Sequence, residues 1–203
     1  MGTRSVMMTS ESNIKPSITG FILAGGKSSR MGQDKGLIQF RGKPMIQYSI
    51  DALSTVCDSI VIISSVPDYN RFGLIVIPDN IHNQGPLAGI CTALSYSETK
   101  TNVILTCDSP FVNTALIEYL VNAMANHDVV VPFFKKRIYP LTAVYQQSSL
   151  PYLLSELNAG HLKVKTVLKE LNLNQLEISE KLPFFSSQLL SNINSPEDLR
   201  QTF

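Results

Sequence analysis

A glycine-rich, basic segment follows the first apolar run of the chain and carries the residue types that bind anions. The run Ile18–Leu23 predicts a short buried strand, and the segment LAGGKSSRMGQDK continues from Leu23 to Lys35. Glycines allow backbone N–H groups to approach a ligand closely. Consecutive N–H groups in such a turn form a nest for anions, to which nearby cations add charge. Open α/β sheets place loops of this kind at their carboxyl edge, so the segment predicts a phosphate-binding site.

Two other phosphate-binding motifs do not fit this segment. The P-loop requires a glycine five positions before the glycine of Gly26-Lys27-Ser28, and Phe21 holds that position. The dinucleotide motif Gly-x-Gly-x-x-Gly is also absent. The alternative interpretation is an ordinary glycine-rich turn with solvated charges, which the strand before the loop and the cations Lys27, Arg30 and Lys35 disfavour. The segment therefore indicates a different kind of nucleotide-binding loop.

Asp108 is a carboxylate placed to serve such a site. It follows the predicted buried strand Val103–Thr106, at what is expected to be the carboxyl edge of a sheet. Mg²⁺ in proteins usually takes one or two carboxylates, with phosphates and waters completing its coordination shell. Asp108 is therefore a candidate Mg²⁺ ligand, and the alternative is a turn-forming carboxylate before Pro110.

The composition describes a globular chain of ordinary charge. Its 203 residues are 44% hydrophobic and 16% charged with a net charge of +1, which predicts one domain over residues 18–203 and no nucleic-acid surface. There is no apolar run long enough for a transmembrane helix. Residues 1–17 lack the apolar core of a signal peptide and are expected to be a disordered tail. Cys57, Cys91 and Cys107 form no Cys-x-x-Cys pair, which argues against disulfides and zinc. The expected location is the cytoplasm.

Strand-like and helix-like segments alternate along the chain. This pattern predicts an α/β fold of three layers around a mostly parallel sheet. After the first strand, further strands are expected at 60–63, 74–77, 103–106, 129–133 and 141–145, and helices at about 44–53, 86–97, 113–124, 149–157, 164–171 and 195–199. No linker or internal repeat divides the sequence.

Residues 23–35 resemble the nucleotidyltransferase signature Leu-Ala-Gly/Ala-Gly-x-Ser-x-Arg-Met-Gly-x-x-Lys. Four further segments, in the same order, make the chain similar to the molybdenum cofactor guanylyltransferases: RGKP at 41–44, GPLAG at 85–89, CDSPF at 107–111 and NINSPEDL at 192–199. The resemblance extends over roughly residues 18 to 201. It implies a Rossmann-like sheet of the nucleotidyltransferase, glycosyltransferase A-like type.

The resemblance also implies a reaction. Enzymes of this family transfer GMP from GTP to the terminal phosphate of molybdopterin and release pyrophosphate, so GTP, molybdopterin and Mg²⁺ are the expected ligands. Other proteins of cofactor synthesis and delivery are possible partners, whereas membranes and nucleic acids are not expected. The acceptor phosphate is already an anion, so catalysis requires alignment and charge neutralisation rather than a general base or a nucleophilic side chain.

The residues that match the family's motifs are the expected site. Arg30, Lys35 and Asp108 are expected to be catalytic, with Asp108 as the Mg²⁺ ligand. Lys27 and Lys43 could each contact a phosphate, but a solvated lysine is an equally good interpretation of either. Asn192 and Asn194 are expected to bind the acceptor, although turn formation and helix capping would also explain them. The basic turn 135–137 could attract the acceptor phosphate or could be a solvated hairpin tip. The expected GTP-binding residues are Leu23, Ala24, Gly25, Gly26, Lys35, Ser64, Asp79 and Asp108.

Two positions bear on nucleotide choice. Related cytidylyl- and uridylyltransferases tend to have Leu-Ala-Ala-Gly, and the missing methyl at Gly25 could make room for a purine. The family commonly has asparagine where this chain has Ser64, which puts nucleotide contact there in doubt; at Asp79, a plain Asp-Asn turn fits the sequence nearly as well. The alternatives to GMP transfer are the same chemistry with CTP or another nucleotide, onto molybdopterin or a sugar phosphate. A further alternative is a non-catalytic nucleotide-binding scaffold, which the presence of Arg30, Lys35 and Asp108 argues against.

Overall fold

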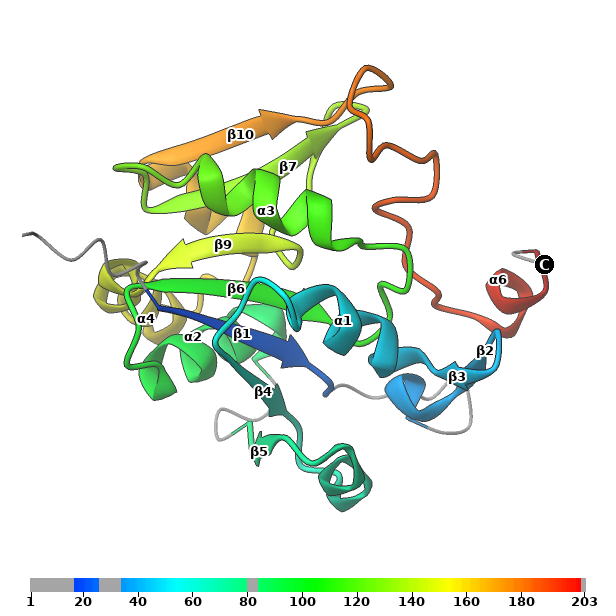
Figure 1. Ribbon diagram of the computed structural model, residues 1–203. Helices are drawn as coiled ribbons and strands as arrows, with labels where there is room; N and C mark the ends of the chain where they lie inside the picture. Colours follow the sequence, from blue (N-terminus) through cyan, green and yellow to red (C-terminus); the bar gives the residue numbers. More distant parts are fainter. Residues whose placement is uncertain (1–16, 26–33, 80–83, 202–203) are drawn as a thin grey trace, which may run out of the picture.

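The fold is built on one mixed sheet with helices on both faces (Figure 1). The structure, a computed structural model, describes residues 17–25, 34–79 and 84–201. The strands in these ranges are β1 (Ile18–Leu23), β2 (Gln39–Phe40), β3 (Lys43–Pro44), β4 (Ser59–Ile63), β5 (Ile75–Ile77), β6 (Thr101–Thr106), β7 (Val129–Phe134), β8 (Arg137–Ile138), β9 (Ala143–Gln146) and β10 (Leu173–Glu177). The α-helices are α1 (Met45–Leu53), α2 (Gly85–Tyr96), α3 (Thr114–Asn122), α4 (Leu150–Asn158), α5 (Val164–Val167) and α6 (Pro196–Gln201). Short 3₁₀ helices are η1 (Lys35–Leu37), η2 (Pro67–Phe72), η3 (Gln147–Ser149) and η4 (Leu168–Glu170).

The strand order of the main sheet is β10-β7-β9-β6-β1-β4-β5, with β8 paired to β7. Strand β1 runs parallel to both β4 and β6, β4 is parallel to β5, and β7 is parallel to β10. Only β9, among the strands on this path, runs antiparallel to both of its neighbours, β6 and β7. The predicted mostly parallel, three-layer α/β architecture is therefore confirmed, with one reversed strand near its centre.

The central strands β1 and β6 are mostly apolar and almost wholly buried because both faces of the sheet are covered. Successive side chains of a strand point to opposite faces, and β1 illustrates this. Phe21 packs in the cluster that includes residues of α2 and α4. Ile22 packs in the cluster that includes residues of α1 and α3. Both side chains are fully buried, and Figure 1 shows α1 and α3 on the near side of the sheet with α2 behind it.

The helix starts follow local chemistry that the sequence displays. Asn113 caps α3 by accepting the Leu116 N–H at 2.9 Å, as expected of an asparagine that precedes an apolar helical repeat. Helix α2 begins at Gly85-Pro86, where Gly85 has a φ of +70° that suits glycine. Pro44 lies one residue before α1, where it ends β3, so the predicted helix begins slightly later than expected.

The carboxyl ends of three parallel strands stand level with one another. Leu23, the last residue of β1, is in register with Ile63 of β4 and with Thr106 of β6. The chain segments that leave these strands therefore emerge side by side. This edge of the sheet receives both the start of the glycine-rich loop and the approach to Asp108.

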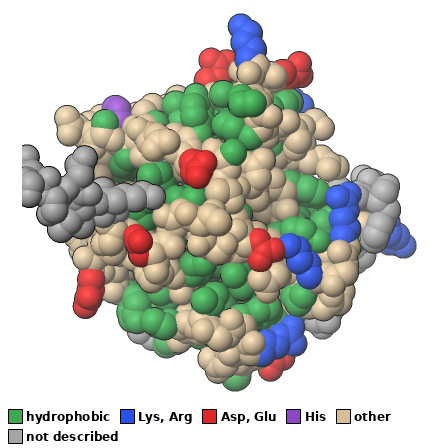
Figure 2. Space-filling view, in the orientation of Figure 1, with side chains coloured by type: hydrophobic (Ala, Val, Ile, Leu, Met, Phe, Trp, Pro, Cys, Tyr) green, Lys and Arg blue, Asp and Glu red, His purple; other side chains and the backbone are tan. Residues whose placement is uncertain are grey.

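The C-terminal segment returns to the same edge of the sheet. Ile193 is buried in a small cluster with Ile38, Phe40 and Met45, which belong to or flank the β2–β3 hairpin. Figure 1 shows α6 beside β2 and β3, at the end of the molecule toward which β1 and β6 point. On the face seen in Figure 2, lysine and arginine side chains gather mainly toward this same end. Within the described part of the chain, no helix is long and apolar enough to cross a membrane.

Candidate active site

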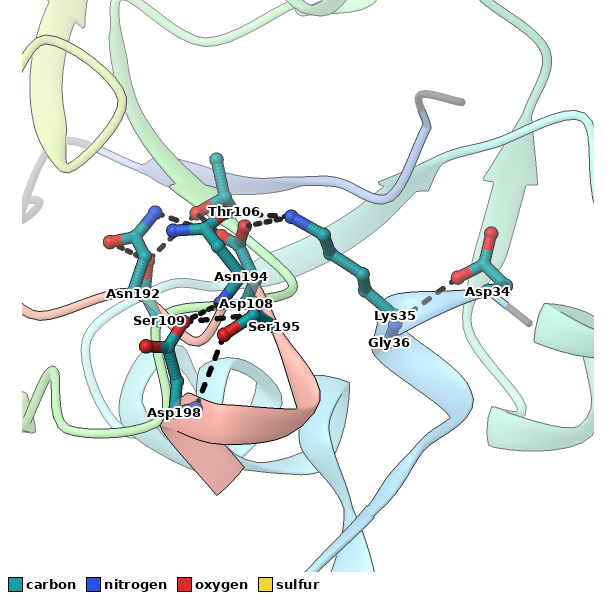
Figure 3. Close-up of polar contacts among 10 residues, drawn as sticks. All are labelled: Asp34, Lys35, Gly36, Thr106, Asp108, Ser109, Asn192, Asn194, Ser195 and Asp198. Atoms are coloured by element: carbon teal, nitrogen blue, oxygen red, sulfur yellow. Dashed lines mark hydrogen bonds and ion pairs between the residues drawn. The ribbon is translucent and has the colours of Figure 1, made fainter. Parts of the chain in front are cut away.

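Lys35 and Asp108 meet at the carboxyl edge of the sheet (Figure 3). The Lys35 Nζ lies 3.3 Å from Asp108 Oδ2, and the two side chains are 24% and 14% exposed. Lys35 is the first residue of η1, and Asp108 is the second residue after β6. The structure thus brings together two predicted catalytic residues from distant segments. Their partial exposure leaves both within reach of a ligand.

Polar neighbours fix the Asp108 carboxylate. Its Oδ1 accepts a hydrogen bond from Thr106 Oγ1 at 2.6 Å and one from Asn192 Nδ2 at 3.0 Å. Ser109 Oγ lies 2.7 Å from Thr106 Oγ1, which extends the network below the carboxylate. Because hydrogen bonds hold Oδ1, the direction of Oδ2 toward Lys35 is set before any ligand arrives.

The two predicted acceptor-binding asparagines join this cluster. Asn194 Oδ1 accepts a 2.7 Å hydrogen bond from Lys35 Nζ, and the Ile193 N–H between them donates to the Asp108 carbonyl at 2.9 Å. Asn192 and Asn194 are exposed while Ile193 is buried. This alternation is what an extended segment produces, so the expectation that both asparagines share one face is met.

A reciprocal cap at the start of α6 secures the asparagine segment. Asp198 Oδ2 accepts the backbone N–H groups of Asn194 and Ser195 at 2.8 and 2.9 Å, and Ser195 Oγ accepts the Asp198 N–H at 3.2 Å. This is the geometry of a capping box. The hydrogen bond from the Asn194 N–H, with those from Ser195 and the nearby charge of Lys35, lowers the pKa of Asp198 from its ordinary value of 3.8.

Asp34 and Tyr69 hold the other side of Lys35. Asp34 caps η1, since its Oδ1 accepts the Gly36 N–H at 3.1 Å. The same oxygen accepts a short hydrogen bond from the hydroxyl of Tyr69, a fully buried residue of η2. Neither residue was predicted from the sequence to belong to the site. The only sequence signal was that Asp34 immediately precedes Lys35 in the basic loop.

The predicted GTP-binding residues at the end of β1 lie beside this cluster. The Ala24 N–H donates to the Ile63 carbonyl at 2.9 Å, and the Leu23 carbonyl accepts the Cys107 N–H at 3.2 Å. These bonds continue the sheet for one residue beyond β1. Gly25 is exposed, and a methyl group added there would meet no atom of the described residues within 4 Å. Gly26, Lys27 and Arg30 lie outside the described residues.

Ser64 and Asp79 stand after β4 and β5, each with a local partner. Ser64 is buried, and its Oγ accepts the Val66 N–H at 3.1 Å, so the hydroxyl stabilises its own turn. Asp79 Oδ1 accepts a hydrogen bond from Thr92 of α2 at 3.2 Å. Nucleotide contact by either residue stays a prediction.

Lys43 and the basic turn 135–137 lie apart from the Lys35–Asp108 pair. Lys43 forms a short ion pair with Asp51 of α1, and its Nζ lies 4.0 Å from the centre of the Tyr48 ring. In the basic turn, Lys135 and Lys136 form the tip between β7 and β8. Lys136 and Arg137 line a cavity of about 280 Å³ together with Lys165 and Lys169, on the side of the sheet that carries α5.

The described residues offer little for a metal beyond Asp108. No group of three His, Cys, Asp or Glu side chains gathers in the described ranges in a way that would hold a metal ion. Burial, together with the charges of Asp108 and Asp34, raises the pKa of the Cys107 thiol, the neighbour of Asp108. Asp108 is therefore the candidate ligand for a metal among the described residues at this edge.

The geometry as a whole suits a phosphate-bearing ligand. The glycine-rich segment begins where the first strand of an open α/β sheet ends, and a lysine, a carboxylate and two asparagines converge at that carboxyl edge. In such sheets ligands bind outside the carboxyl ends of the strands. This fold and site are those of a nucleotidyltransferase-type α/β protein.

Comparison with known proteins narrows the class. The family profile described as the MobA-like NTP transferase domain matches residues 20–176. A probable molybdenum cofactor guanylyltransferase of Flavobacterium johnsoniae is 37% identical over 183 residues, which are 90% of this chain and 94% of the relative. A molybdenum cofactor guanylyltransferase of Vibrio campbellii is 35% identical and covers 89% of this chain and 92% of its own length. The crystal structure of molybdopterin-guanine dinucleotide biosynthesis protein A from Archaeoglobus fulgidus has a TM-score of 0.75 at 28% identity, over 90% of this chain and 95% of that one.

This chain belongs to the MobA-like NTP transferase family. The family expected from the loop and its four companion segments is thereby confirmed.

Proposed function

We propose that this protein transfers GMP from GTP to the terminal phosphate of molybdopterin and releases pyrophosphate, as a step of molybdenum cofactor synthesis. The observation that carries the proposal is the convergence of Lys35, Asp108, Asn192 and Asn194 at the carboxyl edge of the sheet, where the glycine-rich segment begins. The names of the two relatives support GMP as the transferred group. Partner proteins of cofactor synthesis and delivery, and a cytoplasmic location, belong to the same proposal.

The reaction needs charge neutralisation more than acid–base chemistry. An oxygen of the acceptor phosphate attacks the α-phosphorus of GTP, and the bond from that phosphorus to the bridging oxygen of the β-phosphate breaks. Pyrophosphate leaves with that electron pair, and negative charge grows on the phosphate oxygens. Lys35 would bind these oxygens through its ammonium, with Asp108 and Asn194 holding the ammonium at the edge of the sheet. Arg30 and the glycines of the loop would complete the donor site.

Asp108 would hold a Mg²⁺ ion in this scheme. One protein carboxylate is enough for Mg²⁺ when substrate phosphates and waters supply the other ligands. The Asp108 carboxylate could be this ligand, because its side chain is partly exposed and its Oδ2 lies 3.3 Å from the Lys35 Nζ. When bound, the ion would supply Lewis acidity that draws charge from the phosphate oxygens. Thr106 and Asn192 would keep the carboxylate in position through Oδ1.

Asn192 and Asn194 would contact the acceptor. Each amide can both donate and accept hydrogen bonds, which suits the polar edge of a pterin. Ile193 fixes the segment through its burial and its bond to Asp108. Leu23, Ala24 and Gly25, at the carboxyl end of β1, would face the nucleotide.

Turnover of the purified protein tests the proposal. With GTP, Mg²⁺ and molybdopterin, we expect one pyrophosphate for each GMP-molybdopterin formed. Asp108→Asn should lower kcat by about 100-fold or more, since it removes the negative charge that would hold the Mg²⁺ ion and the Lys35 ammonium against the phosphates. Asp128→Asn is the matched control, because Asp128 accepts the Asn172 N–H at the opposite edge of the sheet. Equal activity of the two variants would refute the role of Asp108, and an inactive wild-type protein would refute the function.

The nucleotide can be identified separately by thermal melting with Mg²⁺ and GTP, CTP, UTP or ATP. A ligand at about 100 times its Kd stabilises the folded protein by roughly 2.7 kcal/mol. For a chain of this size that raises Tm by about 5 to 10 °C. GTP should give the largest shift. A larger shift with CTP or UTP would point to transfer of that nucleotide instead, and no shift with any nucleotide would favour a scaffold or a protein that binds its acceptor first.

A further inference from the structure

Tyr69 lies against the end of the basic loop in a way that packing alone does not require. Its side chain is fully buried, and its hydroxyl donates a short hydrogen bond to Asp34 Oδ1. The same oxygen accepts the N–H of Gly36, two residues along the chain. Lys35 lies between Asp34 and Gly36. The hydrogen bond from the Gly36 N–H to the Asp34 carboxylate therefore closes a turn around the lysine.

The backbone at Gly36 packs closely against the Tyr69 side chain. A Cβ at this position would overlap the Tyr69 hydroxyl oxygen and would come within 3.0 Å of Cys107 Cβ. Cys107 directly precedes Asp108. The hydroxyl of Tyr69 is therefore packed between the backbone that carries Lys35 and the backbone that carries Asp108.

Burial, with the nearby Cys107 thiol and the Asp34 carboxylate, raises the pKa of the Tyr69 hydroxyl. The hydroxyl thus keeps its proton across the physiological range and remains a hydrogen-bond donor. The contact is a permanent part of the folded site and does not switch with pH.

We propose that Tyr69 is a positioning residue for the transfer reaction, which acts through Asp34 to hold the Lys35 ammonium against Asp108. This inference rests on the proposed function. Tyr69 would be a buried contact on η2 between the segment that carries Lys35 and the segment that carries Asp108. A displacement of about 1 Å at a reacting group can cost as much as 100-fold in rate, so the loss of one hydroxyl should be visible in kcat.

The test compares Tyr69→Phe with Tyr145→Phe. Both tyrosines are fully buried, and each donates one hydrogen bond, since the Tyr145 hydroxyl donates to the Pro140 carbonyl at 2.8 Å on the other face of the sheet. Both variants keep the ring and its packing. We expect Tyr69→Phe to lower kcat by about tenfold or more while the KM for GTP changes by less than about threefold, because the loss falls on the transition state. Tyr145→Phe should leave both constants near the wild-type values.

A second measurement does not depend on turnover. Amide hydrogen exchange at Gly36 reports the bond to Asp34, and Tyr69→Phe should speed it by about tenfold while Tyr145→Phe leaves it unchanged. Equal Gly36 exchange in the two variants would overturn the inference, whatever the activity of the protein. Equal kcat in the two variants of an active enzyme would overturn it as well. An inactive wild-type protein with faster Gly36 exchange in Tyr69→Phe would count against the proposed function but would support the anchoring of the loop.

Discussion

Asn194 accepts a 2.7 Å hydrogen bond from the ammonium of Lys35 across 159 positions of sequence. The first residue belongs to the segment expected to bind the acceptor, and the second to the loop expected to bind the donor. One cation thus connects the two halves of the proposed reaction. A lysine ammonium has three N–H donors, so under the proposed function Lys35 could bind a nucleotide phosphate while it still contacts Asp108 and Asn194.

This relationship predicts a selective effect of Asn194→Ala. The acceptor loses a hydrogen-bonding group, so its KM should rise about tenfold, in line with about 1.5 kcal/mol for a bond that involves a charged partner. Binding of GTP alone should change by less than about twofold, because Asp108 still holds Lys35. Steady-state kinetics with each substrate varied in turn would measure both effects. Asn174→Ala, which removes an amide that donates to the Ala123 carbonyl far from the site, is the control.

Gly25→Ala tests the basis of guanine preference. The position is exposed, and the new methyl would meet no atom of the described residues, so the melting temperature should not change. If the missing methyl makes room for a purine, the variant should lose about 10- to 100-fold in kcat/KM for GTP relative to CTP, the range that one methyl group can contribute. Competition between the two nucleotides in one reaction gives this ratio directly. An unchanged ratio would show that nucleotide choice lies elsewhere.

Much of the fold could be predicted because strands that are covered on both faces of a sheet have short, mostly apolar sequences. The strand ITGFIL was predicted to its end residues, since a short apolar run between polar segments is typical of a strand that is covered on both faces. Strand β10 was missed because its sequence, LNQLE, is rich in residues that strands usually avoid. It is a strand because it pairs in register with β7 from Val129 to Phe133, and such a tertiary partner cannot be read from a local pattern.

The hairpin after β7 was predicted in its turn but not in its second strand, for a related reason. Its tip is Lys135-Lys136, with φ values of +47° and +60°, a conformation that hairpins usually give to Asn-Gly. Two lysines carry no such turn signal, so the short strand β8 was not predicted. The turn was expected to connect the strands at 129–133 and 141–145 instead. At the site, motif matches pointed to Lys35, Asp108 and the two asparagines. They could not point to Thr106 or Tyr69, whose roles depend on which segments the sheet places side by side.

Gly36→Ala should be costly although the same change at Gly25 is not. A Cβ at position 36 would collide with the Tyr69 hydroxyl and crowd Cys107, so the loop end must move away from both. Overpacking of this kind typically lowers the free energy of unfolding by about 1 to 3 kcal/mol. Chemical denaturation would measure the loss, with Gly25→Ala as the control from the same loop. Equal stability of the two variants would mean that η1 is not seated on Tyr69.

Acid should release the asparagine segment before it unfolds the sheet. Hydrogen bonds from Asn194 and Ser195 lower the pKa of Asp198 below its ordinary value of 3.8. A carboxylate with a lowered folded-state pKa contributes its full stabilisation above the unfolded value, and that contribution is lost as the pH falls through the lower, folded-state value. The amide resonances of Asn194 and Ser195 should therefore be steady above about pH 4 to 5 and shift together below it. Asp198→Asn should give the shifted positions at every pH and raise the acceptor KM at neutral pH. If the Asn194 and Ser195 amide resonances of Asp198→Asn match those of the wild type, then Ile193 alone holds the asparagine segment in place.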